Sequence, residues 1–281
     1  MKAGILLVSG DPLEAAELAA AAEATGWDGV FTWDGISVGP MDTFDPWIVM
    51  AAMAMRTERV RLGAVVTPPA RRRPWKLARE TMTLDRLSNG RLILPVGLGA
   101  PDDAGIGNVG EPADARTRAE RLDEALEILE GLWSGKKFAY DGRHYRFGPM
   151  TFRPTPVQRP RIPIWVIGKW PVERSMRRAL RWDGVMAQGQ DAAGVGAIAE
   201  WVGRERPAGR RADPYDIVVE GTTPPDRDAA AATVRPFAEA GATWWIESDW
   251  EGGTVEGLRA RIAAGPPVAA DRQVRRPQRR K

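Results

Sequence analysis

Cysteine is absent from this chain of 281 residues, and histidine occurs once, at His144. The first absence excludes disulfides and thiol nucleophiles. The second excludes zinc sites built from several histidines and mechanisms that need two of them, and we expect no metal site. No run of about 18 apolar residues occurs, and no charged and then apolar leader precedes the first expected strand. We therefore expect a cytoplasmic protein that does not enter membranes.

An excess of one charge is missing too. The chain has 40 Lys and Arg against 37 Asp and Glu, a net charge of +3, which gives little support for nucleic-acid binding. Basic residues gather only near the end, at Arg272, Arg275, Arg276, Arg279, Arg280 and Lys281. We expect residues 1–265 to form a single domain and residues 266–281 to be a basic, disordered tail that aids solubility.

Familiar catalytic motifs are missing as well. The chain has no G-x-S-x-G sequence, so it lacks the turn that presents a hydrolase serine. Residues 105–110 match the letters of G-x-G-x-x-G, yet no strand precedes them, and we expect a loop there. His144 lies in the sequence GRHYRF, which is typical of a hairpin, and we interpret it as a structural histidine.

Apolar segments typical of buried strands alternate along the chain with segments typical of helices. Strands are expected at residues 3–8, 29–33, 60–66, 91–98, 162–167, 184–187, 215–220 and 243–247. Helices are expected at residues 12–25, 46–55, 74–87, 118–133, 171–181, 192–206, 226–240 and 253–263. A repeat of strand and then helix, with both sheet faces covered, predicts an α/β fold, the TIM (β/α)8 barrel.

Two long segments interrupt the repeat and are expected as insertions at the C-terminal face of the barrel. Residues 101–111 form a loop rich in Gly and Asp, and residues 135–160 are rich in Pro, with a hairpin of residues 137–140 and 143–147. Such loops usually shape a substrate pocket. Pro95 lies inside the fourth expected strand, where a ladder N–H is normally needed, so the strand bends there or has another register.

The helix that ends in LDRLSNGRL and runs into an apolar strand and GLG resembles the luciferase-like flavin oxidoreductases, the superfamily of bacterial luciferase and the F420-dependent dehydrogenases and reductases. Residues 45–68, 153–168 and 178–187 carry further matches. The resemblance implies an oxidoreductase or monooxygenase that binds FMN or coenzyme F420 and acts on a small organic substrate. The helix face that would form a homodimer, or would instead pack on the barrel, consists of Trp47, Ile48, Met50 and Met53.

The same resemblance implies a cofactor site at the carboxyl ends of the strands. The segment Ala64-Val65-Val66 matches the place of a non-prolyl cis peptide behind the ring, expected between Val65 and Val66 unless the segment is an ordinary strand. The other cofactor-binding candidates are Trp33, Gly97, Leu98, Gly99, Gly168, Lys169, Trp170, Gln188 and Gly189. Aromatic side chains that could wall the ring, or could pack in the core, are Trp33, Trp165, Trp170 and Trp245.

Asp34 is the expected catalytic residue. Family members often have an acidic residue followed by histidine at the end of the second strand, whereas this chain has Asp34-Gly35. The missing histidine leaves Asp34 as the general acid/base candidate on that strand, with the alternative that it caps the next turn. Residues 71–73 are three arginines that could reach an anionic group or form a solvated face. Weaker candidates after the last two strands are Gly221, Thr222, Thr223, Glu247 and Asp249.

Three classes of function remain open at this point. An oxidoreductase with F420 would work without oxygen, whereas one with reduced FMN would be a monooxygenase that receives its flavin from a partner reductase. A cofactor-free lyase or isomerase would need paired carboxylates or a buried lysine at the strand ends, and no convincing set is found. A non-catalytic flavin-binding protein would bind the cofactor without turnover.

Overall fold

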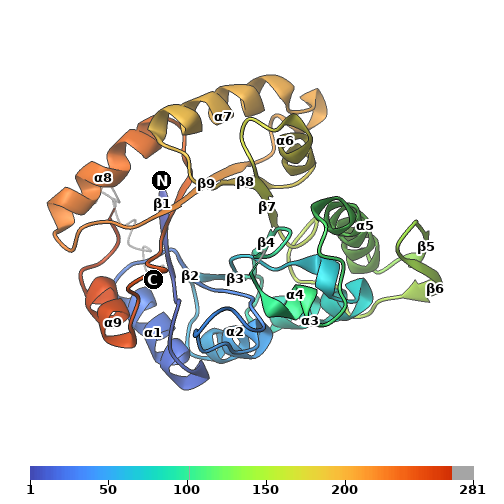
Figure 1. The fold of residues 1–281 in the computed structure, drawn as a ribbon, viewed down its shortest axis with the longest axis horizontal. Coiled ribbons are helices and arrows are strands. Elements are labelled where there is room, and N and C mark those ends of the chain that lie inside the picture. Colours follow the sequence, from blue (N-terminus) through green and yellow to red (C-terminus); the bar gives the residue numbers. More distant parts are fainter. Residues whose placement is uncertain (101, 268–281) are drawn as a thin grey trace, which may run out of the picture.

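The strands of the protein form a ring of eight parallel strands surrounded by helices, in a computed structural model that describes residues 1–100 and 102–267 (Figure 1). The order around the ring is β3-β2-β1-β10-β9-β8-β7-β4. The strands are β1 (Lys2–Leu6), β2 (Gly29–Thr32), β3 (Arg61–Ala64), β4 (Leu94–Val96), β7 (Ile164–Gly168), β8 (Gly184–Ala187), β9 (Asp216–Gly221) and β10 (Trp244–Glu247). This arrangement confirms the predicted TIM barrel. Residues 268–281 of the predicted tail lie outside the described residues.

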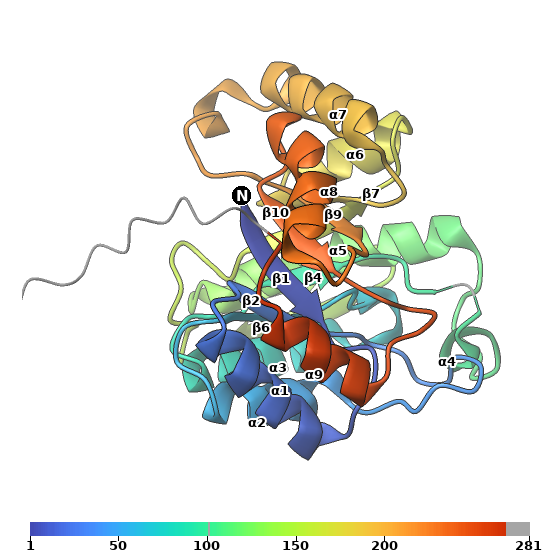
Figure 2. The same ribbon diagram turned by 90° about the vertical axis from the view of Figure 1, so that its left-hand side faces the viewer.

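Helices cover the outer face of the ring, as the two views show (Figures 1 and 2). They are α1 (Pro12–Ala24), α2 (Pro46–Met55), α3 (Pro74–Leu87), α5 (Ala115–Trp133), α6 (Glu173–Leu180), α7 (Ala192–Glu205), α8 (Arg227–Glu239) and α9 (Val255–Ala263). Aspartates accept backbone hydrogen bonds at the start of several of them, as Asp11 does for α1 and Asp114 for α5, which explains where these helices begin. Within the described residues, no helix is both long and apolar enough to cross a membrane.

The ring is weakest between β3 and β4. These two strands meet only through the isolated bridges Leu62–Leu92 and Thr67–Val96. Pro95, in the middle of β4, has no N–H to donate, and its carbonyl accepts a hydrogen bond from the Thr67 N–H at 2.9 Å. The expected strand at residues 91–98 is therefore reduced to the three residues Leu94–Val96.

Large aromatic side chains fill the interior of the barrel. Phe31, Trp165 and Trp244 are fully buried, and their ring centroids lie 5.3–6.1 Å apart. Trp165 is thus a core residue rather than a wall at a strand end. Trp245 points to the opposite face of β10, where its ring lies 5.3 Å from that of Phe237. For Trp165 and Trp245 the structure therefore supports the alternative of core packing, because both lie inside their strands.

Two other local predictions need correction, and burial on α2 bears on an alternative that the sequence left open. The hairpin consists of β5 (Lys137–Asp141) and β6 (Arg146–Thr151), so its second strand begins three residues later than expected. The expected loop at residues 105–110 contains the short helix α4 (Ala104–Gly107), because the Asp103 carboxylate caps it. Of the four residues named for the α2 face, Trp47, Met50 and Met53 are buried within this chain and Ile48 is exposed, which favours packing on the barrel.

Asp85, near the end of α3, provides a test of how this helix is held to the segment that contains Val157 and Gln158. Its buried carboxylate accepts hydrogen bonds from the N–H groups of Val157 and Gln158 and from the Gln158 amide, at 2.7–3.1 Å. We expect Asp85→Ala to lower the free energy of unfolding by about 2–4 kcal/mol, because buried donors lose a charged acceptor. Urea unfolding followed by tryptophan fluorescence measures the change.

The matched control is Asp141→Ala, since Asp141 is exposed and pairs only with the exposed Arg146. Its effect should stay within about 0.5 kcal/mol. Equal losses in the two variants would contradict the role assigned to Asp85.

Candidate functional site

A cavity of about 1080 Å³ opens at the carboxyl ends of the strands. Its floor consists of residues at the last inward-facing position of six of the eight strands, in or directly after the strand. The period of two residues is visible on β9, where Val218 lies in the barrel interior and Glu220 lies above it in the cavity. Barrel enzymes place their chemistry at this end. The floor is formed by Trp33, Val65, Gly97, Ile167, Gln188 and Glu220.

Most of the residues predicted from the sequence line this cavity. They are Trp33, Asp34, Val65, Val66, Gly97, Leu98, Gly99, Gly168, Lys169, Trp170 and Gln188. Ala64 and Gly189 do not. Ala64 belongs to the core between the sheet and the helices, because successive residues of β3 face opposite sides. Gly189 lies one position beyond Gln188 in a turn with φ of 65°. A cofactor-binding role for these residues stays a prediction.

The floor of the cavity is closely packed around Gly97. The peptide between Val65 and Val66 is cis, which confirms that prediction. A Cβ atom at Gly97 would lie 2.9 Å from Ile167 Cγ1 and 3.1 Å from Val66 Cγ2, so a side chain does not fit there. Backbone rather than side chain therefore borders the cavity at this point, which suits close approach by a flat ring.

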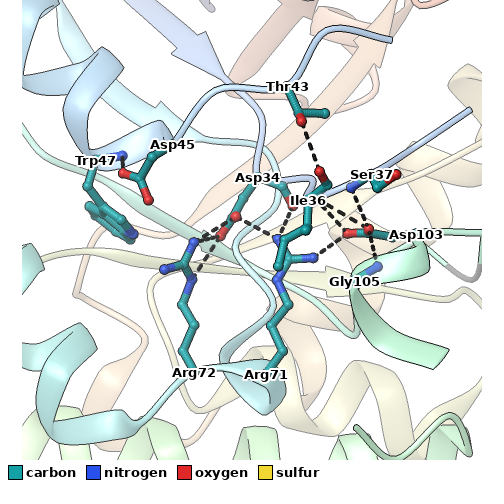
Figure 3. Close-up of polar contacts among 10 residues, drawn as sticks. All are labelled: Asp34, Ile36, Ser37, Thr43, Asp45, Trp47, Arg71, Arg72, Asp103 and Gly105. Carbon is teal, nitrogen blue, oxygen red and sulfur yellow. Dashed lines mark hydrogen bonds and ion pairs between the residues drawn. The ribbon is translucent and has the colours of Figure 1, made fainter. Parts of the chain in front are cut away.

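Asp34 belongs to a buried ion-pair cluster that we call the clasp: Asp34, Arg71, Arg72 and Asp103 (Figure 3). Asp34 Oδ1 lies 2.6 Å from Arg71 Nη2 and 2.7 Å from Arg72 Nη2, and its Oδ2 accepts from Arg72 as well. The Asp34 side chain is 1% exposed. Both of its oxygens are thus already occupied, which argues against the general acid/base role expected for Asp34. The arginines at 71 and 72 form no solvated face.

Asp103 extends the clasp to the loop that follows β2. Its carboxylate pairs with Arg71 and accepts hydrogen bonds from the N–H groups of Ile36, Ser37 and Gly105 at 2.9–3.4 Å (Figure 3). Burial alone would raise the pKa of Asp103, but these backbone donors and the Arg71 charge stabilise the carboxylate and lower the pKa. The clasp therefore joins the loops after β2, β3 and β4 at the cavity mouth.

Cations gather at one side of the cavity, and sequence reasoning missed most of them. Arg118 is buried and Lys169 and Arg174 are exposed, and none of these three has a carboxylate within 4 Å among the described residues. Arg118 donates from Nη1 to the Leu98 carbonyl, and its Nε has no partner. Two further arginines at the cavity are neutralised, Arg116 by Glu120 and Arg178 by Asp123. The spacing of Arg174 and Arg178, one helical turn apart, was a signal available in the sequence.

Glu220 and Trp250 were also missed. Trp250 Nε1 donates to Glu220 Oε1, and the Trp250 ring meets the Trp33 ring edge-on at a centroid distance of 6.0 Å. The alternation along β9 was the signal that could have found Glu220. The weaker candidates after the last strands do not line the cavity. Glu247, for example, accepts hydrogen bonds from Thr223 and pairs with Arg261.

His144 lies away from the cavity, in the turn between β5 and β6. Its Nε2 is 3.1 Å from Glu120 Oε2, and its backbone N–H donates to Glu124. Both glutamates belong to α5, so His144 holds the hairpin on this helix. This placement agrees with the structural role that the sequence suggested.

The lowered pKa of Asp103 gives a test of the clasp. Its folded-state pKa lies below the unfolded value of about 3.9, so its stabilising contribution is complete above that value and disappears as the pH falls through the folded-state pKa. We expect Asp103→Asn to lower the free energy of unfolding at pH 7. The difference in this free energy from the unmutated protein should shrink as the pH falls toward about 3. Urea unfolding at a series of pH values measures the difference. Asp42→Asn, at an exposed position, is the control. A deficit independent of pH would contradict this account.

Comparison with known proteins places the chain in a family. The family model described as luciferase-like monooxygenase matches residues 3–272. An uncharacterized protein of Mycobacterium tuberculosis is 39% identical over 126 residues, which is 45% of this chain and 43% of that protein. An F420-dependent glucose-6-phosphate dehydrogenase of Nakamurella multipartita is 28% identical over 90% of this chain and 84% of its own length. The first of these matches thus spans less than half of the relative.

Solved structures share the fold at lower identity. A monooxygenase from Streptomyces bottropensis superposes with a TM-score of 0.79 at 22% identity and covers 94% of this chain and 98% of its own. The coenzyme F420-dependent tetrahydromethanopterin reductase from Methanopyrus kandleri superposes with a TM-score of 0.76 at 17% identity, covering 93% and 97%. Since the family model spans nearly the whole barrel, this chain belongs to the luciferase-like monooxygenase family.

Proposed function

We propose that this protein is an F420-dependent oxidoreductase that moves a hydride between the deazaflavin and a small organic substrate. The observation that carries the proposal is the set of unpaired cations at the cavity, Arg118, Lys169 and Arg174. FMN has one phosphate, whereas F420 has a phosphodiester followed by glutamate carboxylates and so presents several anionic groups. A site with several uncompensated cations suits the longer anionic tail.

The rest of the cavity fits a flat ring beside a substrate. Its volume of about 1080 Å³ exceeds that of most single-ligand pockets, which span roughly 300–1,000 Å³. Val65, Val66 and Leu98 offer apolar contacts, and Gly97 leaves room for backbone contact with a ring. The deazaflavin, when bound, supplies two-electron hydride chemistry. The Nakamurella relative, which matches 90% of this chain, is named for F420 and adds support.

We assign parts of the cavity to parts of the ligand on this basis. Arg118, Lys169 and Arg174 would hold the anionic tail, together with the start of α6, where the Lys169 N–H donates to Ser175 Oγ at 3.0 Å. Trp33 would lie toward the substrate. The clasp would keep the loop after β2 in place and so exclude water from the ring.

A binding titration tests the proposal directly. The purified protein is titrated with F420, FMN, reduced FMN and the deazaflavin chromophore without its tail, and tryptophan fluorescence and ring absorbance are followed. We expect F420 to bind most tightly, to lose affinity with added salt, and to bind more tightly than its tail-less form. A preference for reduced FMN would instead indicate a monooxygenase supplied by a flavin reductase. Binding of none of the four would refute the proposal.

The buried cation gives a sharper test. We expect Arg118→Gln to weaken F420 binding by about ten- to a hundredfold, because a charge-assisted hydrogen bond contributes about 1.5–3 kcal/mol. The affinity for the tail-less chromophore should hardly change. Arg177→Gln is the matched control, since Arg177 lies on α6, pairs with Glu173 and does not line the cavity. Equal affinities of both variants for F420 would show that Arg118 does not bind the tail.

A further inference from the structure

Glu220 is placed where a barrel enzyme needs a reactive side chain. It is the last inward-facing residue of β9: Val218 lies beneath it in the barrel interior, whereas Ile217 and Val219 face the helices. Gly221, which follows it, ends the strand. Glu220 is partly buried and lines the cavity, so a ligand there can reach its carboxylate.

The three carboxylates that line the cavity differ in what they already bind. Asp34 and Asp103 are held by arginines of the clasp. Glu220 has no cation within 4 Å among the described residues, and its one hydrogen bond is the one that Oε1 accepts from Trp250 Nε1. Its Oε2 is without a protein donor in this part of the chain. Glu220 is thus the carboxylate of the cavity that can accept or release a proton without breaking an ion pair.

The surroundings of Glu220 are neutral or acidic. The adjacent end of β8 carries Gln188 and Gln190, which have no charge. The adjacent end of β10 carries Trp250 and Asp249, and the Asp249 carboxylate accepts from the Gly252 N–H at 2.9 Å. Glu251, next along that loop, is exposed. Among the described residues, no lysine or arginine at these strand ends forms an ion pair with Glu220.

The charges of the cavity also lie at different strand ends. The unpaired cations follow β4 and β7, which are neighbours in the ring, whereas Glu220 lies at the end of β9 and Trp250 follows β10. Trp33, which directly follows β2, meets Trp250 edge-on, and β2 and β10 both lie next to β1 in the ring. One side thus suits an anionic tail, and the other side, with two indole rings and a carboxylate, suits an uncharged substrate that has an O–H group.

We propose that Glu220 is the proton-transfer residue of this site, in place of Asp34. This inference rests on the proposed function. In the oxidative direction the substrate O–H bond breaks and its proton passes to the Glu220 carboxylate, while the C–H bond breaks and its hydride passes to the oxidised deazaflavin. The O–H electron pair forms the carbonyl bond. In the reductive direction the Glu220 carboxyl group gives its proton to the carbonyl oxygen as the hydride reaches the carbon.

The experiment compares both directions in variants of the full chain loaded with F420. The probes are an uncharged pair, cyclohexanol for oxidation and cyclohexanone for reduction by reduced F420, followed by the absorbance of the deazaflavin. The variants are Glu220→Gln, which cannot take a proton, and Glu220→Asp, which can. The control is Glu256→Gln, because Glu256 is exposed on α9 and does not line the cavity.

We expect Glu220→Gln to lower kcat by about a hundredfold or more in both directions, with the Kd for F420 and the KM of the probes changed only a few fold. Oxidation by the unmutated protein should decline as the pH falls, because Glu220 must be ionised. Reduction should decline as the pH rises, because Glu220 must be protonated. Glu220→Gln should lose both dependences, and Glu220→Asp should keep them at a reduced rate.

Other outcomes overturn the inference. Full kcat in Glu220→Gln, or a reduced kcat with an unchanged pH profile, would assign proton transfer to another group. A protein that binds F420 but turns over neither probe would also overturn it. Failure to bind F420 is a different result, because it refutes the proposed function itself.

Discussion

The cavity mouth depends on one buried cation, Arg71, placed between the carboxylates of Asp34 and Asp103. The arginine follows β3, and its two partners follow β2 and β4, so a single guanidinium joins three consecutive loops. Its side chain is 4% exposed. A buried charge is stable only while it is paired, so none of the three loops can move far without leaving a charge unpaired. These pairs therefore also fix the positions of the neighbouring parts of the cavity wall, which include Trp33 and the segment after Gly97.

The clasp also determines which charges of the cavity stay unpaired. Since Asp34 and Asp103 are committed to arginines, they contribute little free charge to the cavity. What is left is cationic near the start of α5 and α6 and acidic at Glu220. Under the proposed function, this distribution of charge would favour one orientation of an elongated ligand with an anionic end.

The barrel and much of the floor of the cavity could be predicted from the sequence. Alternating strand and helix patterns predicted the ring, and the glycine-rich end of β4 predicted where backbone borders the cavity. The clasp could not be predicted, because Asp34 and Arg71 are distant in sequence and meet only through the 3-10 turn η1 (Pro69–Arg71). The ion pairs of Asp34 with Arg71 and Arg72 argue against the general acid/base role that was expected for it. The period of two residues along β9 could have predicted Glu220, whereas the carboxylate candidates named after the last two strands were Glu247 and Asp249, which do not line the cavity.

The sparse pairing of β3 with β4 has a mechanical consequence. Elsewhere in the ring each strand is tied to its neighbours by a regular ladder, whereas here two isolated bridges flank Pro95. Local separation of strands costs least where the fewest hydrogen bonds must break. Val66 and Gly97 border the cavity directly above this seam. Separation of the strands along this line would therefore break the fewest ladder hydrogen bonds, and the Arg71–Asp103 ion pair, which joins the loops after β3 and β4, holds the two strands together above it.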